Sequence, residues 1–229
     1  ALEKSLLSKI SPNFQSLFLI FISRFNRIFM IIAGIDEAGR GAIIGPMVLA
    51  GVSIEGKDLK KLKAIGVKDS KELSPKKREE IYKQIELIAK NVIVIKVPAC
   101  MITSYQKKKI NLDKIEAMKM AEIINTIEAK KIYIDSIEQN SEKFESLIKE
   151  FLGENGKEKK LIVKNYLDES VPVVSAASII AKVERDLEVE KIKEKVNFDF
   201  GVGYSHDIRT IKFLENILQN EEEPPNYLR

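Results

Sequence analysis

Two acidic residues beside a glycine-flanked arginine are the part of this sequence best suited to chemistry. Asp36 and Glu37 follow an apolar segment, and Gly39-Arg40-Gly41 comes soon after them. Adjacent carboxylates repel each other unless a cation neutralises them, and Mg²⁺ prefers oxygen ligands of this kind. Glycines let backbone N–H groups approach a phosphate, which a guanidinium can also bind. The segment indicates phosphodiester chemistry, although a polar turn that caps a strand explains these residues alone equally well.

Further carboxylates occur much later in the chain. Asp135 ends an apolar segment, where open α/β sheets place ligand sites, but a lone acid there is usually only a turn former. A fourth acid could be Asp168, Glu169 or Asp186, and Asp186 also has the spacing for a surface ion pair with Lys182. Four converging carboxylates could hold two divalent ions roughly 4 Å apart, one producing hydroxide and the other stabilising a leaving oxygen.

Such chemistry needs neither histidine nor a covalent nucleophile. Ser136 has no base near it in the sequence, and His206 is interpreted as a surface or loop residue. A polar segment, Asp69-Ser70-Lys71, precedes the basic residues 76–78, and such a patch can neutralise several phosphates. Ordinary loop chemistry and a solvated helix face explain these two segments as well.

Hydrophobic patterning predicts the elements that must position these residues. Apolar, β-branched runs predict strands at 30–36, 47–55, 91–97, 131–135 and 160–164, the first two antiparallel. Helical spacing and capping residues predict helices at about 75–90, 112–128, 142–152, 173–196 and 207–219. The order predicts an α/β fold, a sheet of mixed direction covered by helices. Small residues at 175–178 should let a helix pack close to the sheet, and the charged segment 153–160 should be a surface turn.

Length and composition suit one domain with an appendage. The 229 residues are 45% hydrophobic, and the net charge of +4 restricts any polyanion site to a local patch. The single Cys100 excludes an intrachain disulfide framework and fits a reducing cytoplasm, and no Cys/His cluster has zinc spacing.

The first 29 residues differ from the rest of the chain. Arg24 and Arg27 interrupt the apolar stretch 14–30 well short of the ~20 residues that a spanning helix needs, so no membrane span is predicted. Lys4 and Lys9 precede the apolar run, but no small-residue cleavage pattern follows it. We interpret residues 1–29 as an N-terminal extension of unknown role, or as the result of a start site placed too far upstream.

Five ordered motifs across about 31–214 resemble those of the ribonuclease HII family, the type 2 ribonucleases H. The motifs are 34–41 with Gly45-Pro46, Asp69-Ser70-Lys71, Tyr133-Ile134-Asp135, 171–182, and Gly201-Val202-Gly203-Tyr204. The resemblance implies a ribonuclease H-like fold, with a mixed five-stranded sheet, flanking helices and a helical C-terminal region. Residues 30–229 would then form the catalytic domain.

The resemblance also implies an activity and a set of metal ligands. The enzyme would hydrolyse the RNA strand of RNA/DNA hybrids and cut duplex DNA 5′ to embedded ribonucleotides, leaving 3′-hydroxyl and 5′-phosphate ends. Two Mg²⁺ or Mn²⁺ ions would be bound by Asp36, Glu37, Asp135 and Asp168. Asp168 is chosen because it lies four residues before Pro172, where the family has its last catalytic aspartate.

The implied substrate contacts come from three segments. The backbone of the Gly-Arg-Gly segment and a tyrosine would read the junction between a ribonucleotide and the next deoxynucleotide, and a serine and a lysine would hold the nucleic-acid backbone. These residues are Gly39, Arg40, Gly41, Tyr204, Ser70 and Lys71.

Three departures from the family pattern are visible. Ala42 stands where proline is usual, Tyr166-Leu167 replace Lys-Ala, and Ser205-His206-Asp207 follow the tyrosine. Ala42 removes no ligand, so we expect a slightly looser turn with its chemistry intact, and Asp207 still suits a helix cap.

Two alternatives follow from these departures and from the wider family. A hybrid-binding module without turnover stays open, although retention of all four acids argues against it. Ribonuclease HIII is the nearest enzyme alternative, but it typically lacks this Asp-Glu-Ala-Gly-Arg-Gly form. We expect a monomer, and no sliding-clamp binding tail is evident after about residue 214, where the chain appears short.

Overall fold

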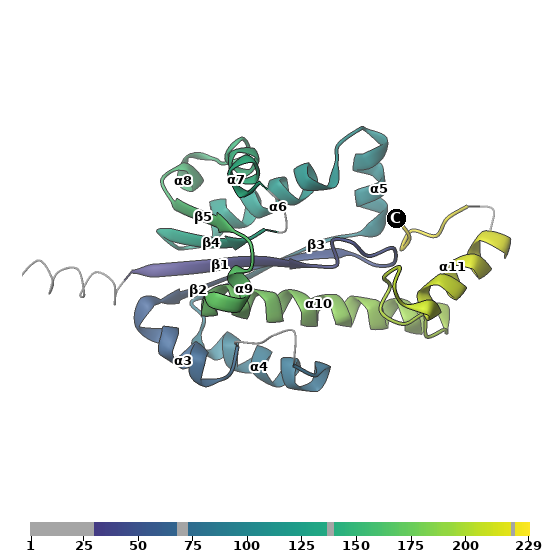
Figure 1. The fold of residues 1–229 in the computed structure, drawn as a ribbon, viewed down its shortest axis with the longest axis horizontal. Helices are drawn as coiled ribbons and strands as arrows, with labels where there is room; N and C mark the ends of the chain where they lie inside the picture. Colours follow the sequence, from purple (N-terminus) through teal and green to yellow (C-terminus); the bar gives the residue numbers. More distant parts are fainter. Residues whose placement is uncertain (1–29, 68–72, 137–139, 221–222) are drawn as a thin grey trace, which may run out of the picture.

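A mixed five-stranded sheet forms the centre of the molecule, as the sequence predicts (Figure 1). The structure is a computed structural model that describes residues 30–67, 73–136, 140–220 and 223–229. The strand order is β3-β2-β1-β4-β5, with β1 antiparallel to β2 and parallel to β4. The strands are β1 (Ile31–Ala38), β2 (Met47–Glu55), β3 (Asn91–Val97), β4 (Lys131–Asp135) and β5 (Lys160–Lys164).

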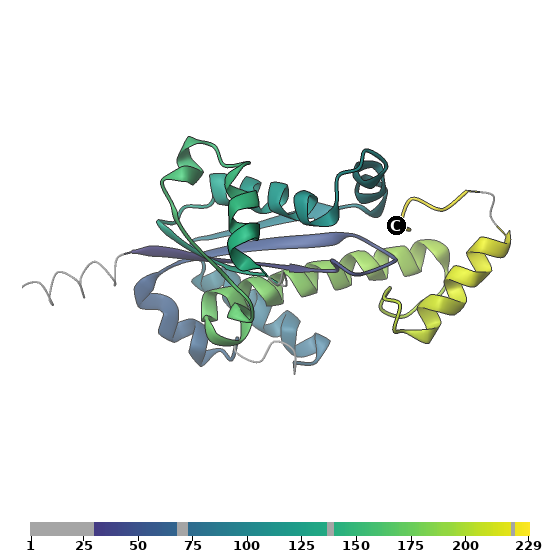
Figure 2. The same cartoon turned by 45° about the horizontal axis from the view of Figure 1, so that its top comes forward.

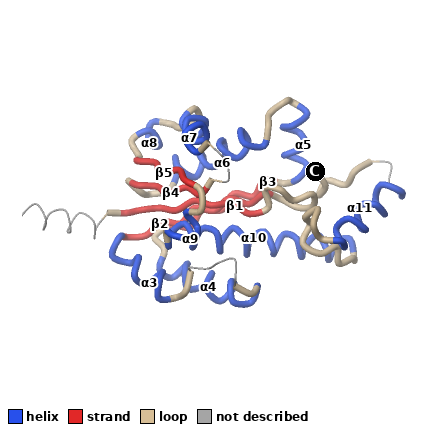
Figure 3. The backbone as a smooth tube through the Cα atoms, in the orientation of Figure 1, coloured by secondary structure: helices blue, strands red, loops and turns tan. Residues whose placement is uncertain are grey.

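Helices cover both faces of this sheet, as Figures 1 and 2 show. One face carries η1 (Gly56–Asp58), α3 (Leu59–Ala64), α4 (Pro75–Ile88), α9 (Leu167–Ser170) and α10 (Pro172–Val196). The other carries α5 (Ala99–Lys107), α6 (Leu112–Thr126), α7 (Ser141–Lys149) and α8 (Glu154–Lys157). The last helix, α11 (Ile208–Asn220), lies beyond the end of the sheet near the C-terminus (Figure 3). Among the residues that the structure describes, no helix is long and apolar enough to cross a membrane.

Alternation along β1 divides the core into two layers. Ala33 and Ile35 pack into the core that includes α6 and α7, whereas Ile32 and Ala38 pack into the core that includes α10. Successive strand residues point to opposite faces of a sheet, which explains this division. The same alternation must separate the side chains of Asp36 and Glu37, since β1 continues through both residues and ends at Ala38.

Helix α10 lies very close to β1, as its small residues predict. Residues 173–181 of α10 are all buried, Ser175 and Ser178 included. A Cβ added at Gly34 would lie 2.4 Å from the backbone carbonyl carbon of Val173. Because only glycine leaves this space, Gly34 sets the distance between the sheet and the helix that supports the candidate site.

Replacing Gly34 with alanine should therefore destabilise the fold by about 3 kcal/mol, since helix backbone cannot move aside as a flexible side chain can. Chemical denaturation would measure the change in unfolding free energy. Gly41→Ala is the matched control, because a Cβ there meets nothing within 4 Å. Equal denaturation midpoints for the two variants would contradict the close packing of α10 on β1.

Short elements account for most differences from the sequence prediction. Helices α3, α5 and α9 were not predicted, and α8 lies inside the segment expected to be a surface turn. Helix α5 buries only Ala99 and Ile102, and α3 buries only Leu62, so neither has the repeated apolar spacing that reveals a longer helix. All five predicted strands are present, and β1 extends two residues further than expected.

Candidate active site

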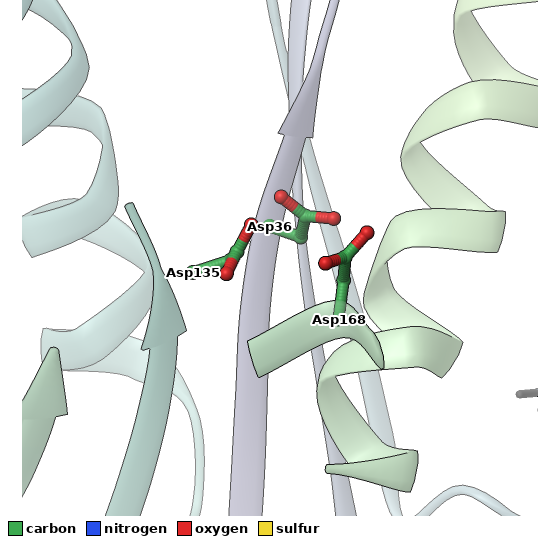
Figure 4. A group of neighbouring side chains, drawn as sticks. All are labelled: Asp36, Asp135 and Asp168. Carbon is green, nitrogen blue, oxygen red and sulfur yellow. The ribbon is translucent and has the colours of Figure 1, made fainter. Parts of the chain in front are cut away.

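Three aspartates from distant parts of the chain converge at one edge of the sheet (Figure 4). Asp36 lies near the end of β1, Asp135 ends the adjacent parallel strand β4, and Asp168 lies in α9. One carboxylate oxygen from each lies within 4.8 Å of the others. The carboxyl ends of neighbouring parallel strands meet at one edge of a sheet, which brings the first two together, and α9 supplies the third.

Hydrogen bonds from two helices, α9 and α10, hold these aspartates in place. The Asp135 Oδ1 accepts from the backbone N–H of Leu167 at 2.6 Å, which attaches α9 to β4. The Ser175 hydroxyl donates to the backbone carbonyl of Asp168 at 2.5 Å, and the Ser178 side chain hydrogen-bonds Asp36. Helix α10 therefore orients two of the three aspartates through serines one turn apart.

A lysine on the same helix adds positive charge to the site. The Lys182 Nζ donates to the Ser178 hydroxyl at 2.9 Å and lines the same cavity of about 240 Å³ as the three aspartates. The pKa of Asp36 rises to about 7, chiefly because burial disfavours its charge and secondly because Asp135 is close; Ser178 and Lys182 oppose this rise. A set of crowded carboxylates fits a divalent cation, which would relieve this repulsion.

Glu37 lines the same cavity as the three aspartates but lies outside the group that converges within 4.8 Å. Its carboxyl lies near Glu116 of α6, and burial followed by the Glu116 charge raises the pKa of Glu37 well above its usual range. The Glu37 Oε2 is buried and has no hydrogen-bond partner in the described part of the chain. A buried carboxyl oxygen left this way fits a role as a ligand for a cation, as the sequence suggested.

Arg40 binds carboxylates in this structure. Its Nε donates to the Glu116 carboxylate at 2.6 Å, and its Nη2 pairs with Asp113 at the start of α6. These bonds fasten the loop after β1 to α6, and the phosphate contact that the sequence suggested for this guanidinium stays a prediction. The backbone at Gly41 remains exposed, so a phosphate could approach the loop there.

The loop after β1 and the Gly201–Tyr204 segment form one unit. The carbonyl of Gly203 accepts from the backbone N–H of both Ile43 and Ile44, at 2.8 and 3.0 Å. The Arg229 Nη1 donates to the Arg40 carbonyl at 2.7 Å, which braces the loop from its other side. Two motifs more than 150 positions apart in the sequence thus lie against each other. The loop of the first motif begins at Gly39, three residues after Asp36.

Ala42 contributes to the same loop. Its backbone N–H donates to the Gly39 carbonyl at 3.3 Å, a bond that the proline usual at this position could not make. Asp207 follows the tyrosine segment and accepts from the Arg209 backbone N–H at 2.9 Å at the start of α11, as expected of a cap.

Of the other sequence candidates that the structure describes, only Ser136 shares the cavity of the three aspartates. Asp186 pairs with Arg78 of α4 at 2.9 Å, so the predicted pair with Lys182 is wrong. Glu169 is exposed, and His206 is exposed with its ring centroid 5.4 Å from that of Tyr204. Ser136 is buried and lines the cavity. Ser70 and Lys71 lie outside the described residues.

Sequence reasoning missed three residues of this site. Ser178 was assigned to packing alone, and Lys182 was considered only as a partner for Asp186. The helical spacing of Ser175, Ser178 and Lys182 places them on one face of the helix, and this pattern could have indicated that they act together. Glu116 is a buried acid within the apolar stripe of α6, a combination that usually marks a paired charge.

Comparisons with known proteins identify the family of this chain. The family model described as Ribonuclease HII matches residues 33–229. Ribonuclease HII of Thermococcus kodakarensis is 40% identical over 202 residues, covering 87% of this chain and 86% of the relative. That of Caldivirga maquilingensis is 43% identical over 194 residues, covering 84% of this chain and 88% of the relative.

Solved structures give the same result. Ribonuclease H2 from Pyrococcus horikoshii has a TM-score of 0.79 at 39% identity and covers 87% of this chain and 92% of its own. RNase HII from Archaeoglobus fulgidus, solved as a complex with PCNA, has a TM-score of 0.79 at 37% identity and covers 87% and 94%. A ribonuclease HIII solved with Mn²⁺ matches with a TM-score of 0.70 at 22% identity, covering 86% of this chain and 64% of its own, and shows a shared fold.

Proposed function

Because the chain belongs to the ribonuclease HII family, we propose that it hydrolyses the RNA strand of RNA/DNA hybrids and incises duplex DNA 5′ to embedded ribonucleotides. Membership makes the protein a ribonuclease H nuclease. The observation that supports the finer proposal is the convergence of Asp36, Asp135 and Asp168 within 4.8 Å at the sheet edge, beside the loop that carries Gly39-Arg40-Gly41.

The four proposed metal ligands are Asp36, Glu37, Asp135 and Asp168. When bound, two Mg²⁺ or Mn²⁺ ions would activate a water and stabilise the departing 3′ oxygen, leaving a 5′-phosphate. The chain's own contribution is to fix the ligands: Ser175 holds the Asp168 backbone, Ser178 orients Asp36, and Leu167 orients Asp135. Such rigid support keeps ligand positions independent of the substrate.

Substrate recognition is proposed for the unit next to this centre. The exposed backbone at Gly41 and the half-buried Tyr204 lie in two loops that hydrogen-bond each other, so both could contact one nucleotide junction. Arg40 would act through its backbone, since its side chain is occupied by α6. Ser70 and Lys71 stay predicted contacts to the nucleic-acid backbone.

A DNA duplex with one ribonucleotide tests the proposal directly. The protein would be incubated with that duplex and Mg²⁺, Mn²⁺ or chelator, beside Asp135→Asn. We expect metal-dependent cleavage 5′ to the ribonucleotide, lost in the variant. Tight binding without cleavage under either metal would instead support the non-catalytic hybrid-binding module.

Gly41→Ala should separate substrate binding from folding. An added Cβ meets nothing within 4 Å, so stability should not change, but it would stand where a phosphate approaches the backbone. We expect KM to rise roughly tenfold, the loss of about 1.4 kcal/mol of binding, with little change in kcat. Steady-state kinetics on the single-ribonucleotide duplex would measure both constants. An unchanged KM would show that Gly41 does not contact the substrate.

For assembly, we propose a monomer of the catalytic domain 30–229. The complex with PCNA belongs to the Archaeoglobus fulgidus relative. Sedimentation of this chain alone and with a sliding clamp would test both points, and a single species of about 26 kDa is expected without the clamp.

A further inference from the structure

Arg185 is a buried cation that the proposed chemistry does not use. It lies on α10, one turn after Lys182, and is 4% exposed. Its Nη2 donates to the Val202 carbonyl at 2.8 Å and approaches the Ile44 carbonyl at 3.5 Å. Its Nε is buried without a hydrogen-bond partner in the described part of the chain. Burial of a guanidinium among carbonyl groups is costly, so packing alone is a weak reason for this residue.

Two motif glycines make room for this side chain. A Cβ at Gly39 would lie 2.5 Å from the Arg185 Nε, and one at Gly203 would lie 3.2 Å from its Nη2. Both glycines have a φ near +80°, in the left-handed region. Arg185 therefore fills the space that the Gly-Arg-Gly loop and the tyrosine loop leave between them.

The guanidinium also lies against the proposed junction-reading tyrosine. The Arg185 Cζ is 4.6 Å from the centroid of the Tyr204 ring, a cation–π distance. A planar guanidinium can stack on a ring while its N–H groups bind carbonyls, whereas a lysine ammonium cannot do both in the same geometry. The orientation of Tyr204 and the position of its loop thus depend on the same side chain.

We propose that Arg185 is a positioning residue that fixes Tyr204 and the Gly39–Gly41 backbone relative to each other. This arrangement makes the enzyme prefer single-ribonucleotide junctions over long RNA/DNA hybrids. This inference rests on the proposed junction-reading function. Helix α10 would then serve two ends of the site, since Ser175 and Ser178 orient the metal ligands and Arg185 orients the substrate loops.

A double-mutant cycle separates this role from general stability. The variants are Tyr204→Ala, Arg185→Lys, Arg185→Met and the Tyr204→Ala/Arg185→Lys double. For each, kcat/KM is measured on the single-ribonucleotide duplex and on a long RNA/DNA hybrid, and the ratio of the two is compared. Lys191→Met is the control, since Lys191 lies on α10 but pairs with Glu188 at the surface.

We expect Tyr204→Ala and Arg185→Lys each to lower the ratio roughly tenfold, and the double variant to lower it no further. An unchanged ratio in Tyr204→Ala would defeat the junction-reading function itself. A lowered ratio in Tyr204→Ala with an unchanged ratio in Arg185→Lys, or additive losses in the double, would overturn the role of Arg185. If Arg185→Met fails to fold, Arg185→Lys, which keeps the charge and the stem, provides the test.

Discussion

Asp168→Asn is expected to lower metal-dependent cleavage by roughly 10³-fold, equivalent to about 4 kcal/mol of transition-state stabilisation. Asp168 is 5% exposed and supplies one of the three converging carboxylates, so the amide would remove a negative charge at the centre of the site. Cleavage of the single-ribonucleotide duplex at saturating Mg²⁺ and Mn²⁺ would measure the loss.

Asp186→Asn is the matched control for this loss. Asp186 was an alternative ligand on sequence grounds, yet its carboxylate pairs with Arg78 and is half-exposed. An exposed ion pair of this kind contributes little, so activity should stay within about twofold of the original. Should Asp186→Asn abolish cleavage while Asp168→Asn does not, the assignment of the fourth ligand would be reversed.

Metal should stabilise the protein at pH 8 and have little effect at pH 5. The folded-state pKa of Asp36 is about 7, against the usual 3.8, because of burial and the nearby Asp135. Between these values the folded state keeps a proton that the unfolded state has lost, so raising the pH lowers the stability of the metal-free protein until about pH 7. Burial raises the pKa of Glu37 as well, so Glu37 acts in the same direction as Asp36.

A divalent cation reverses this trend because it binds the deprotonated carboxylates. Stabilisation should approach about 2.7 kcal/mol when Mn²⁺ is at 100 times its Kd, and should fade as protons displace the metal below pH 7. Thermal unfolding from pH 5 to pH 8, with Mn²⁺ or with chelator, would measure the effect. Asp36→Asn should flatten the pH dependence of the metal-free protein, and equal metal stabilisation at pH 5 and pH 8 would argue against binding at these aspartates.

Local patterning was sufficient to predict the framework of the site. Each of the five strands has a continuous apolar run, so the positions of Asp36 and Asp135 near two strand ends could be predicted without the fold. The long helix α10 was also predictable, since its small residues indicated close packing on the sheet. Family motifs added the choice of Asp168, which matches the residue that converges with the other two aspartates in space.

Tertiary structure alone decided what each of these side chains contacts. Glu37 faces α6 because β1 continues past Asp36, and Arg40 meets Glu116 across 76 positions of sequence. Arg185 reaches the Ile44 carbonyl across 141 positions. Periodicity reports which face of an element is apolar, but a polar side chain shows no such preference until another segment supplies its partner. The sequence by itself therefore determined where the main strands and helices and the candidate acidic ligands lie along the chain. The packing of α6 and α10 on opposite faces of β1 determined which partners these side chains contact.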